Sequence, residues 1–228
     1  MVTNSFSEKV INWYKLHGRH DLQWRKAITP YRIWISEIML QQTQVVTVKP
    51  YFKKFIKKYP TLKSIQDASE DEILTLWSGL GFYKRARNIF RTKEIIHSEH
   101  KGRFPKTFEE INKLPGIGKS TAGAIMSIAH QIPTPILDGN VKRILQRYFS
   151  DGKNIFSEKE LWDLSLSVSN ATNSNLYTQG IMDIGATICT PQNPECFRFP
   201  LSPNCESALD RKSTRLNSSH SSVSRMPS

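Results

Sequence analysis

Apolar residues recur along the chain mostly at intervals of three and four, and few stretches alternate between apolar and polar positions. This period predicts a mainly helical protein. A first helix is expected over residues 6–17, where Phe6, Val10 and Trp13 fall on one stripe and Leu16 lies at its edge. A polar loop follows this segment.

Start and stop signals divide the rest of the chain. Thr29 is suited to cap a helix that begins at Pro30. Capping-box patterns precede two further apolar runs, Ser69 with Glu72 and Thr107 with Glu110. Glycine or proline interrupts the pattern at 79–81, 115–118 and 133–135. Helices are therefore expected over 82–99, over 119–130, after Gly139, and twice within 157–188.

The chain has 228 residues and a formal net charge of +12. This excess favours a polyanionic partner, because cationic side chains that bind phosphates release condensed counterions. A basic protein without such a partner remains the alternative. The helix expected over 82–99 carries several of the cations: Lys84, Arg85, Arg87, Arg91 and Lys93.

No apolar run approaches the length of a membrane span, and the first residues lack the apolar core of a signal peptide. We therefore expect a cytoplasmic protein, nucleoid-associated if bacterial, with no membrane partner, and acting as a monomer. Residues 206–228 are rich in Ser and Arg after Asp210 and resemble translated vector sequence. This tail is expected to be disordered and non-native, which makes the chain a fragment cut shortly after Cys205.

The segment LPGIGKSTAGAI, residues 114–125, predicts two short helices joined by a glycine-rich turn. Gly116 and Gly118 allow positive φ and close approach of the backbone. The amides of the turn and of the next helix form an anion site suited to one DNA phosphate, and Lys119 adds charge. An ordinary helical hairpin with a tight turn is the structural alternative.

Glu37 has mainly apolar neighbours one helical turn away, Ile33, Trp34 and Leu40. Burial on this stripe would raise the pKa of the carboxyl, so that it acts as a general acid near neutral pH. The alternative is a glutamate at the edge of the apolar face that reaches water.

Asp138 stands just before a helix expected to begin near Val141, where the helix dipole and free amides favour the ionised carboxylate. Plain N-capping, by Asp138 or by Asn140, is the alternative. Cleavage of an N-glycosidic bond needs two such carboxylates: one protonates the leaving base, and the other faces the developing oxocarbenium ion.

Five blocks in order, WISEIMLQQTQV, LWSGLGFYKRARN, LPGIGKSTAGAI, ILDGNVKRIL and MDIGATIC, resemble the MutY-type adenine DNA glycosylases of the helix-hairpin-helix superfamily. The resemblance covers residues 6–205. It implies an all-α fold with a six-helix barrel over 29–132, which includes the hairpin at 114–125. Residues 1–28 and 133–205 would form the second helical part. Double-stranded DNA would bind across the cleft, with adenine flipped into a pocket.

The resemblance also implies roles for single residues. Glu37 matches the general acid that protonates adenine at N7, and Asp138 matches the carboxylate that stabilises the oxocarbenium ion. Gln179 matches a residue that hydrogen-bonds the adenine edge, and Gln42 one that wedges into the duplex. Phe82 stands where the family often has tyrosine, so stacking beside the opposite base is retained without the phenolic hydrogen bond.

Ser120 stands where related endonuclease III-type enzymes place a lysine that forms a Schiff base. Serine cannot form that imine, so base removal without strand cleavage is expected. The implied substrate is adenine opposite 8-oxoguanine or guanine, and the family's C-terminal Nudix-like domain would follow beyond this chain. Two alternatives remain: an endonuclease III-like lyase, and an inactive DNA-binding fragment.

The three cysteines, Cys189, Cys196 and Cys205, are an odd, clustered set that suggests metal binding before disulfides. The resemblance implies a [4Fe-4S] cluster in a loop over 189–205, held by the pattern Cys-x6-Cys-x2-Cys-x5-Cys. Phe199 occupies the third of these four positions. Three thiolates with an external fourth ligand, and absence of the cluster, both stay open.

Overall fold

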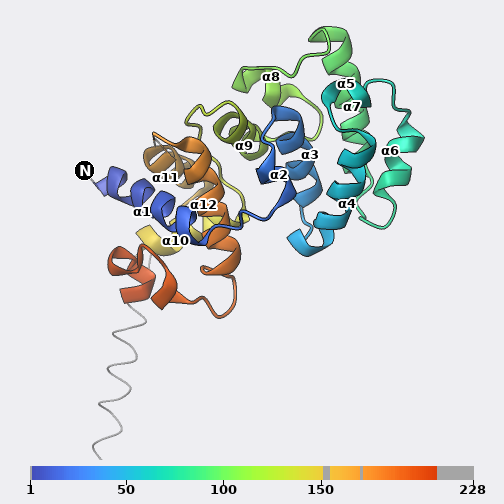
Figure 1. The fold of residues 1–228 in the computed structure, drawn as a ribbon. Helices are drawn as coiled ribbons and strands as arrows, with labels where there is room; N and C mark the ends of the chain where they lie inside the picture. The colour runs from blue at the N-terminus through green and yellow to red at the C-terminus, as the bar shows by residue number, and fades with distance from the viewer. Residues whose placement is uncertain (1, 151–154, 170–171, 210–228) are drawn as a thin grey trace, which may run out of the picture. The chain divides into compact units, whose positions relative to one another are not determined.

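A computed structural model describes residues 2–150, 155–169 and 172–209. Every regular element in these ranges is a helix (Figure 1), which confirms the predicted all-α fold class. None of the helices in the same ranges combines the length and the apolar character needed to cross a membrane.

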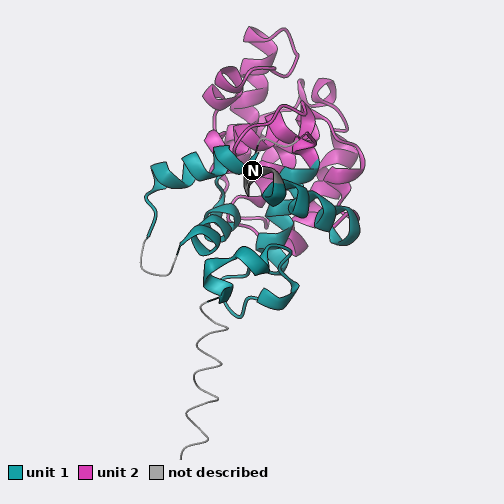
Figure 2. Ribbon diagram, turned by 90° about the vertical axis from the view of Figure 1, so that its left-hand side faces the viewer, with its two compact units in different colours: residues 1–18, 137–171, 176–228 teal, residues 19–136, 172–175 magenta. Residues whose placement is uncertain are grey.

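The chain divides into two compact units, coloured separately in Figure 2. Unit 1 comprises residues 1–18, 137–171 and 176–228, and unit 2 comprises 19–136 and 172–175. Unit 1 contains α1 (Val2–His17), α10 (Gly139–Phe149), α11 (Glu158–Ser169), nearly all of α12 (Ser174–Thr187), and the short 3-10 helices η1 (Cys196–Arg198) and η2 (Ser202–Asn204). Unit 2 contains α2 (Gln23–Lys26), α3 (Pro30–Leu40), α4 (Val45–Lys58), α5 (Leu62–Ile65), α6 (Glu70–Trp77), α7 (Lys84–Glu99), α8 (Phe108–Lys113) and α9 (Lys119–Ala129).

Residues 19–28 belong to unit 2, whereas the sequence placed them with the second helical part. Leu22 and Trp24 in this segment are buried. The Trp24 ring packs edge-on against Phe52 of α4, with 5.3 Å between ring centroids. These apolar contacts make the segment part of the core of unit 2.

The first helix buries a stripe that differs in part from the predicted one. Phe6 and Val10 are buried as expected, and Tyr14 continues their row at a spacing of four. Trp13 is only half-buried, and Leu16 is 77% exposed. The prediction was therefore wrong at Trp13, because the buried side follows the i, i+4 row and not the i+3 neighbour.

The predicted caps form, with one difference. The Thr29 side chain accepts a hydrogen bond at the start of α3, and Ser69 with Glu72 forms a complete capping box ahead of α6. At α8 the Thr107 hydroxyl accepts from the Glu110 amide but donates to the Glu110 carboxylate at 2.7 Å. Each such cap contributes about 1 kcal/mol to helix stability.

Helix α3 is the central element of unit 2 and packs against α2, α4, α7 and α9. Its side chains are buried on almost all sides: Tyr31, Ile33, Trp34, Ile35, Ser36, Ile38 and Met39. A helix that is apolar around most of its circumference must lie inside the protein. Any polar group on it is thereby fixed by close packing.

Residues 206–209 are helical, and the amides of Ala208 and Leu209 donate to the Cys205 carbonyl at 2.9 and 3.0 Å. The predicted disordered tail therefore does not include these four residues. The rest of that prediction, residues 210–228, lies outside the described residues.

Candidate nucleic-acid interface and catalytic residues

Glu37 projects from the middle of α3 and is half-buried, while Ile33 and Trp34 one turn before it are 2% and 0% exposed. The Ser36 hydroxyl beside it donates back to the Ile33 carbonyl at 2.8 Å, so its hydrogen bond stays within the helix. The predicted helical position of Glu37 on a largely buried helix is confirmed, and its half-burial agrees both with a buried carboxyl and with one at the edge of the apolar face.

The glycine-rich turn between α8 and α9 is the segment for which the sequence predicts a backbone anion site. Gly116 has φ +80°, and a Cβ there would lie 2.7 Å from the Asn88 side-chain nitrogen, so glycine is required. Gly118 is extended (φ −91°) and caps α9 with its backbone alone, so it does not use the positive φ that glycine allows. Apart from its own chain neighbours, no atom lies within 4 Å of a Cβ built at Gly118, so the space beside this residue is open.

Lys119 and Ser120 are the first two residues of α9, next to this open backbone. Lys119 is exposed and Ser120 is half-buried. The Gln41 side chain, just past the end of α3, donates to the Gly116 carbonyl at 3.1 Å. This hydrogen bond links the hairpin to the turn that carries Gln42, and both lie in unit 2.

Gln42 and Phe82 both have left-handed backbone conformations, with φ of +55° and +50°. Both side chains are exposed, Phe82 to 58%. Non-glycine residues rarely adopt this conformation, and it tends to be kept where a turn has a function. Both turns therefore present an exposed side chain from a backbone conformation that non-glycine residues rarely adopt.

Helix α7 begins at Lys84, two residues later than predicted, and its cations do not all face solvent. Arg85 and Lys93 are 6% and 3% exposed. The Lys93 ammonium donates to the Gln66 carbonyl at 2.7 Å. Both cations lie inside the protein, so the basic surface expected of this helix is smaller than the sequence indicated.

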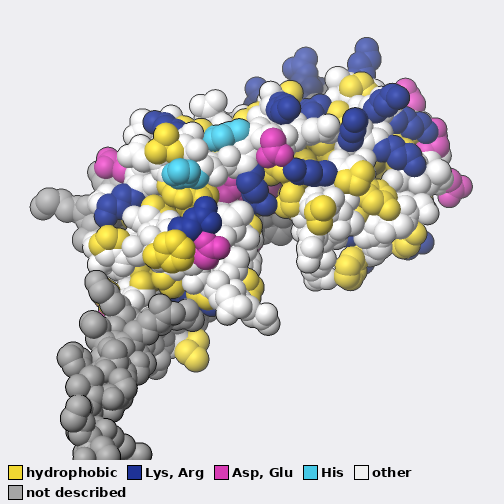
Figure 3. All heavy atoms as spheres, turned by 60° about the horizontal axis from the view of Figure 1, so that its bottom comes forward, with side chains coloured by type: hydrophobic (Ala, Val, Ile, Leu, Met, Phe, Trp, Pro, Cys, Tyr) yellow, Lys and Arg dark blue, Asp and Glu magenta, His cyan; other side chains and the backbone are white. Residues whose placement is uncertain are grey.

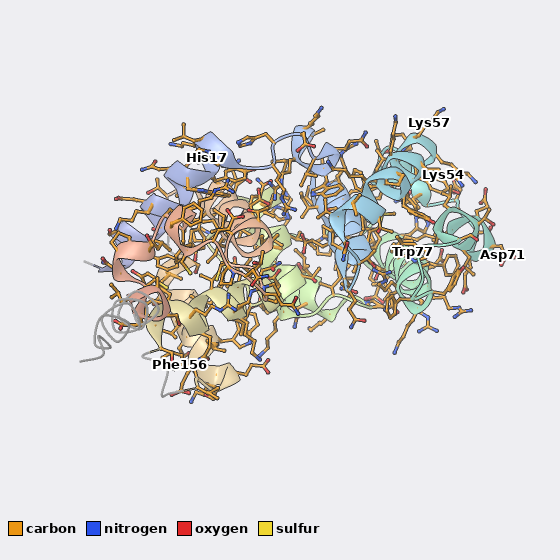
Figure 4. All side chains as sticks on the ribbon, turned by 90° about the horizontal axis from the view of Figure 1, so that it is seen from below. His17, Lys54, Lys57, Asp71, Trp77 and Phe156 are labelled. Carbon is orange, nitrogen blue, oxygen red and sulfur yellow. The ribbon has the colours of Figure 1, made fainter. Side chains whose placement is uncertain are left out.

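Helix α4 supplies a basic surface that sequence reasoning missed. Its exposed cations are Lys49, Lys53, Lys54, Lys57 and Lys58. Lys54 and Lys57 point away from the helix in Figure 4, whereas Trp77 lies among its neighbours inside unit 2. Lys and Arg side chains gather over this part of unit 2 in Figure 3. The spacing of the lysines along residues 49–58 was the available signal, and such a surface attracts polyanions.

Asp138, in unit 1, caps the N-terminus of α10. Its Oδ1 accepts from the Val141 amide at 2.8 Å, and its Oδ2 accepts from the Asn140 side chain at 3.3 Å. Asp138 and not Asn140 is therefore the capping residue. A cap of this kind does not exclude a catalytic role.

The pKa of Asp138 is raised above its usual value of 3.8, mainly because burial disfavours the charged form. Hydrogen bonds from Val141 and Asn140 and the charge of Arg143 act in the opposite direction but do not cancel this effect. The sequence predicted that the helix N-terminus would favour the ionised form, so desolvation reverses the expected direction.

Gln179 lies in α12 of unit 1 and is 3% exposed. Glycines allow α12 to approach its neighbours closely. A Cβ at Gly180 would lie 3.0 Å from Val10 and Tyr14 of α1, and one at Gly185 would lie 2.5 Å from the Asn140 Cβ. The helix that carries Gln179 therefore runs beside the N-terminus of α10, where Asp138 lies.

Two arginines of α10 hold the start of the cysteine-containing loop. Arg143 donates to the carbonyls of Gly185 and Cys189 at 2.7 and 2.6 Å. Arg147 donates to the Thr190 carbonyl at 2.7 Å and contacts the Cys189 sulfur at 3.5 Å. Sequence reasoning missed both residues. Their spacing of four on a helix that follows the capping aspartate was the available signal.

The cysteines lie near one another in unit 1, with Cys189 and Cys205 buried. Burial raises the pKa of the Cys205 thiol against a hydrogen bond from Ala208, and the nearby Cys189 and Cys196 thiols add to the rise.

Phe199 is 6% exposed, so an apolar ring occupies the third position of the expected cluster pattern. Within residues 2–150, 155–169 and 172–209, no three His, Cys, Asp or Glu side chains are placed to hold a metal ion. A cubane cluster needs four iron ligands. The described residues therefore do not fit a four-thiolate cluster, and no chemical step below involves one.

Replacing Phe199 with Cys completes the pattern Cys-x6-Cys-x2-Cys-x5-Cys. We expect the Phe199→Cys protein to bind more iron than the wild type after anaerobic reconstitution, because four thiolates complete the ligand set. Iron content and the visible absorption spectrum measure this. Phe199→Ser is the matched control, since it removes the same ring without adding a thiol. Equal iron in wild type and Phe199→Cys would contradict the expectation.

Comparison with known proteins identifies relatives over most of the chain. A family model described as HhH-GPD superfamily base excision DNA repair protein matches residues 35–165. The chain is 48% identical over 218 residues to an adenine DNA glycosylase of Buchnera aphidicola subsp. Baizongia pistaciae, covering 95% of this chain and 62% of that protein. It is 38% identical over 213 residues to an adenine DNA glycosylase of Homo sapiens, covering 88% and 39%. The chain thus spans less than two thirds of the length of these relatives.

Solved structures share the fold. A thermostable thymine-DNA glycosylase superposes with a TM-score of 0.81 at 29% identity, covering 90% of this chain and 96% of that one. A trapped endonuclease III–DNA covalent intermediate superposes with a TM-score of 0.75 at 21% identity, covering 91% and 96%. The second likeness shows the fold alone.

Proposed function

Because this chain belongs to the HhH-GPD superfamily of base excision DNA repair proteins, we propose that it hydrolyses the N-glycosidic bond of adenine in double-stranded DNA. The adenine stands opposite 8-oxoguanine or guanine. The observation that carries the proposal is 48–51% identity to adenine DNA glycosylases across 88–95% of the chain. We infer that the protein acts as a monomer in the cytoplasm.

Glu37 is proposed as the general acid. Adenine leaves poorly as an anion, and protonation at N7 makes it a neutral leaving group. The half-buried position of Glu37 on α3 supports this role, because packing around the helix fixes the direction of the carboxyl. Positioning of this kind is a large part of what an enzyme contributes to catalysis.

Asp138 is proposed to stabilise the oxocarbenium ion that forms as the base departs. A carboxylate removed from water interacts more strongly with a developing positive charge than one in solvent. Hydrogen bonds from Val141 and Asn140 hold the carboxylate in place before the reaction. Since its pKa is raised by burial, we expect activity to fall as the pH drops through that raised value.

The remaining site residues are proposed to hold the DNA. The backbone amides at Gly116 and Gly118, with Lys119, bind one phosphate at the start of α9. Gln42 and Phe82 probe the duplex from two neighbouring turns. In unit 1, Gln179 is proposed to recognise the edge of the flipped adenine, which its near-complete burial in α12 supports, since ordered surroundings limit its rotamers.

Ser120 is proposed to limit the reaction to base removal, because a serine at this position cannot support strand cleavage. A lyase needs an amine that forms an imine with the sugar C1′, and borohydride reduces that imine to a stable protein–DNA adduct. We expect the wild type to release adenine and leave an abasic strand without any trapped adduct. Ser120→Lys is the positive control, because it supplies an amine at this position.

Two results of the trapping experiment would favour the alternatives. A borohydride-stable adduct formed by the wild type would support a lyase of the endonuclease III kind. DNA binding without release of any base would support an inactive DNA-binding fragment.

A further inference from the structure

Arg85 is a buried cation whose hydrogen bonds go to backbone carbonyls. One guanidinium nitrogen, Nη1, faces the carbonyls of Ile38, Met39 and Gln41 at 3.2, 2.7 and 2.5 Å. The other, Nη2, faces the carbonyls of Leu80 and Gly81 at 3.4 and 3.2 Å. No carboxylate of the described residues is recorded in an ion pair with it.

The first group of carbonyls lies at the C-terminus of α3. The last carbonyls of a helix have no partner within the helix and carry partial negative charge. The positive Arg85 side chain satisfies several of them at once. It therefore fixes the point where α3 ends and the turn containing Gln42 begins.

The second group lies in the turn between α6 and α7. Arg85 also lies over two aromatic rings beside this turn, since its Cζ is 5.4 Å from the centroid of Trp77, the last residue of α6, and 5.2 Å from that of Phe82. The Trp77 indole nitrogen also donates to the Gly81 carbonyl at 3.0 Å. The turn is thus attached to Arg85 by hydrogen bonds and by ring contacts.

The two turns joined in this way are the two that carry the exposed, left-handed residues Gln42 and Phe82. Such conformations persist only where surrounding structure enforces them. A planar guanidinium can serve two sets of carbonyls in fixed directions, whereas an ammonium is a point charge without that geometry. Burial also disfavours the charge itself and lowers the pKa of Arg85, and the hydrogen bonds to the carbonyls of both turns offset this cost.

We propose that Arg85 is a positioning residue for DNA recognition: it holds the turn carrying Gln42 and the turn carrying Phe82 in one arrangement, so that both side chains enter the duplex together. The inference rests on the proposed function, because it takes these two side chains as the groups that contact the lesion. Arg85 itself, being buried, acts through the turns and not through DNA.

The test compares the wild type with Arg85→Lys and Arg85→Met. Glu99→Gln is the control, because Glu99 is an exposed side chain on the same helix with no place in the DNA-binding surface. The probe is a duplex with 2-aminopurine beside a non-hydrolysable adenine analogue opposite guanine. Insertion of side chains unstacks 2-aminopurine and raises its fluorescence. In parallel, single-turnover assays on an ordinary A:G duplex measure the rate constant of adenine release separately from the active fraction.

We expect both Arg85 variants to bind the duplex but to lose the rise in fluorescence. Their rate constants for adenine release should fall on the order of 10- to 100-fold, the size of effect produced by a small misplacement of positioning groups. Glu99→Gln should match the wild type. A merely structural residue would lower the active fraction and leave the rate constant and fluorescence of the active protein unchanged, which would overturn the proposal.

The remaining outcomes are equally decisive. Unfolding of both variants at the assay temperature would give Arg85 a structural role only and overturn the proposal. A wild-type rise in fluorescence without adenine release, lost in Arg85→Lys, would support the positioning role while the adenine assignment fails. A wild type that shows neither the fluorescence rise nor adenine release would overturn both the positioning role and the adenine assignment.

Discussion

Glu37→Gln should abolish adenine release while leaving DNA binding intact. Glutamine has nearly the same size and can occupy the same half-buried position on α3. Its amide is not acidic, however, and cannot protonate N7. General acid catalysis typically contributes 100- to 10,000-fold to a rate, so a loss of about this size is expected in the single-turnover rate constant. The measurement uses excess protein over an end-labelled A:8-oxoguanine duplex, followed by alkaline cleavage of abasic strands.

Glu99→Gln is the matched control for this variant, because Glu99 is an exposed carboxylate at the end of α7. It should release adenine at the wild-type rate. Normal release by Glu37→Gln would remove Glu37 from the reaction, and loss of duplex binding would show that the substitution acts on the fold.

Asp138→Asn should separate the two roles of this residue. Asparagine caps helices as well as aspartate does, so the hydrogen bond from the Val141 amide should persist. The negative charge opposite the oxocarbenium ion is lost, however. Adenine release should slow by about 100- to 1,000-fold, as when one preorganised electrostatic group is removed from an active site.

The same variant should be more stable than the wild type at neutral pH. Burial raises the pKa of folded Asp138 above that of the unfolded chain. The stability that this group contributes is therefore present at low pH, and it is lost as the pH rises through the folded pKa. A neutral Asn avoids this loss, so the advantage of Asp138→Asn in thermal unfolding should shrink on acidification.

Asp138→Ala serves as the comparison for Asp138→Asn. It removes the charge and the cap together, and loss of the cap should cost about 1 kcal/mol. Wild-type activity in Asp138→Asn, or an Asn variant as destabilised as the Ala variant, would contradict this division of roles.

Local signals accounted for much of the helical fold. The caps at Thr29 and Ser69 depend on residues within three positions, and the structure has them as predicted. The helix at 119–130 is bounded by glycine and a break in the apolar period, and α9 spans Lys119–Ala129. These elements were predictable because the interactions that start and stop them lie within one turn.

Features set by distant partners were not predictable. Arg85 and Lys93 have the spacing of surface cations, but carbonyls from α3 and from Gln66 bring them into the core. The raised pKa of Asp138 has a similar origin, because the desolvation that outweighs its cap comes from tertiary packing. The observed boundary between the units differs from the predicted one for the same reason. Residues 19–28 belong to unit 2 because Trp24 packs on Phe52 of helix α4, which is distant in the sequence.

For the candidate catalytic residues, too, local position was predictable from the sequence and the association of distant residues was not. The sequence pattern placed Glu37 on a helix and Asp138 before one, and both positions agree with the structure. Their assignment as a pair depends on the family resemblance, because each side chain alone has an adequate structural explanation. Chemistry on a defined substrate is therefore the decisive test.

The most direct measurement is the identity of the base that the wild-type chain releases. The protein is incubated with separate duplexes containing A opposite 8-oxoguanine, A opposite guanine, A opposite thymine, and an oxidised pyrimidine, and free bases are separated by chromatography. We expect free adenine from the first two duplexes, with strands that break only after alkali. Release of the oxidised pyrimidine, or of no base from any duplex, would contradict this expectation.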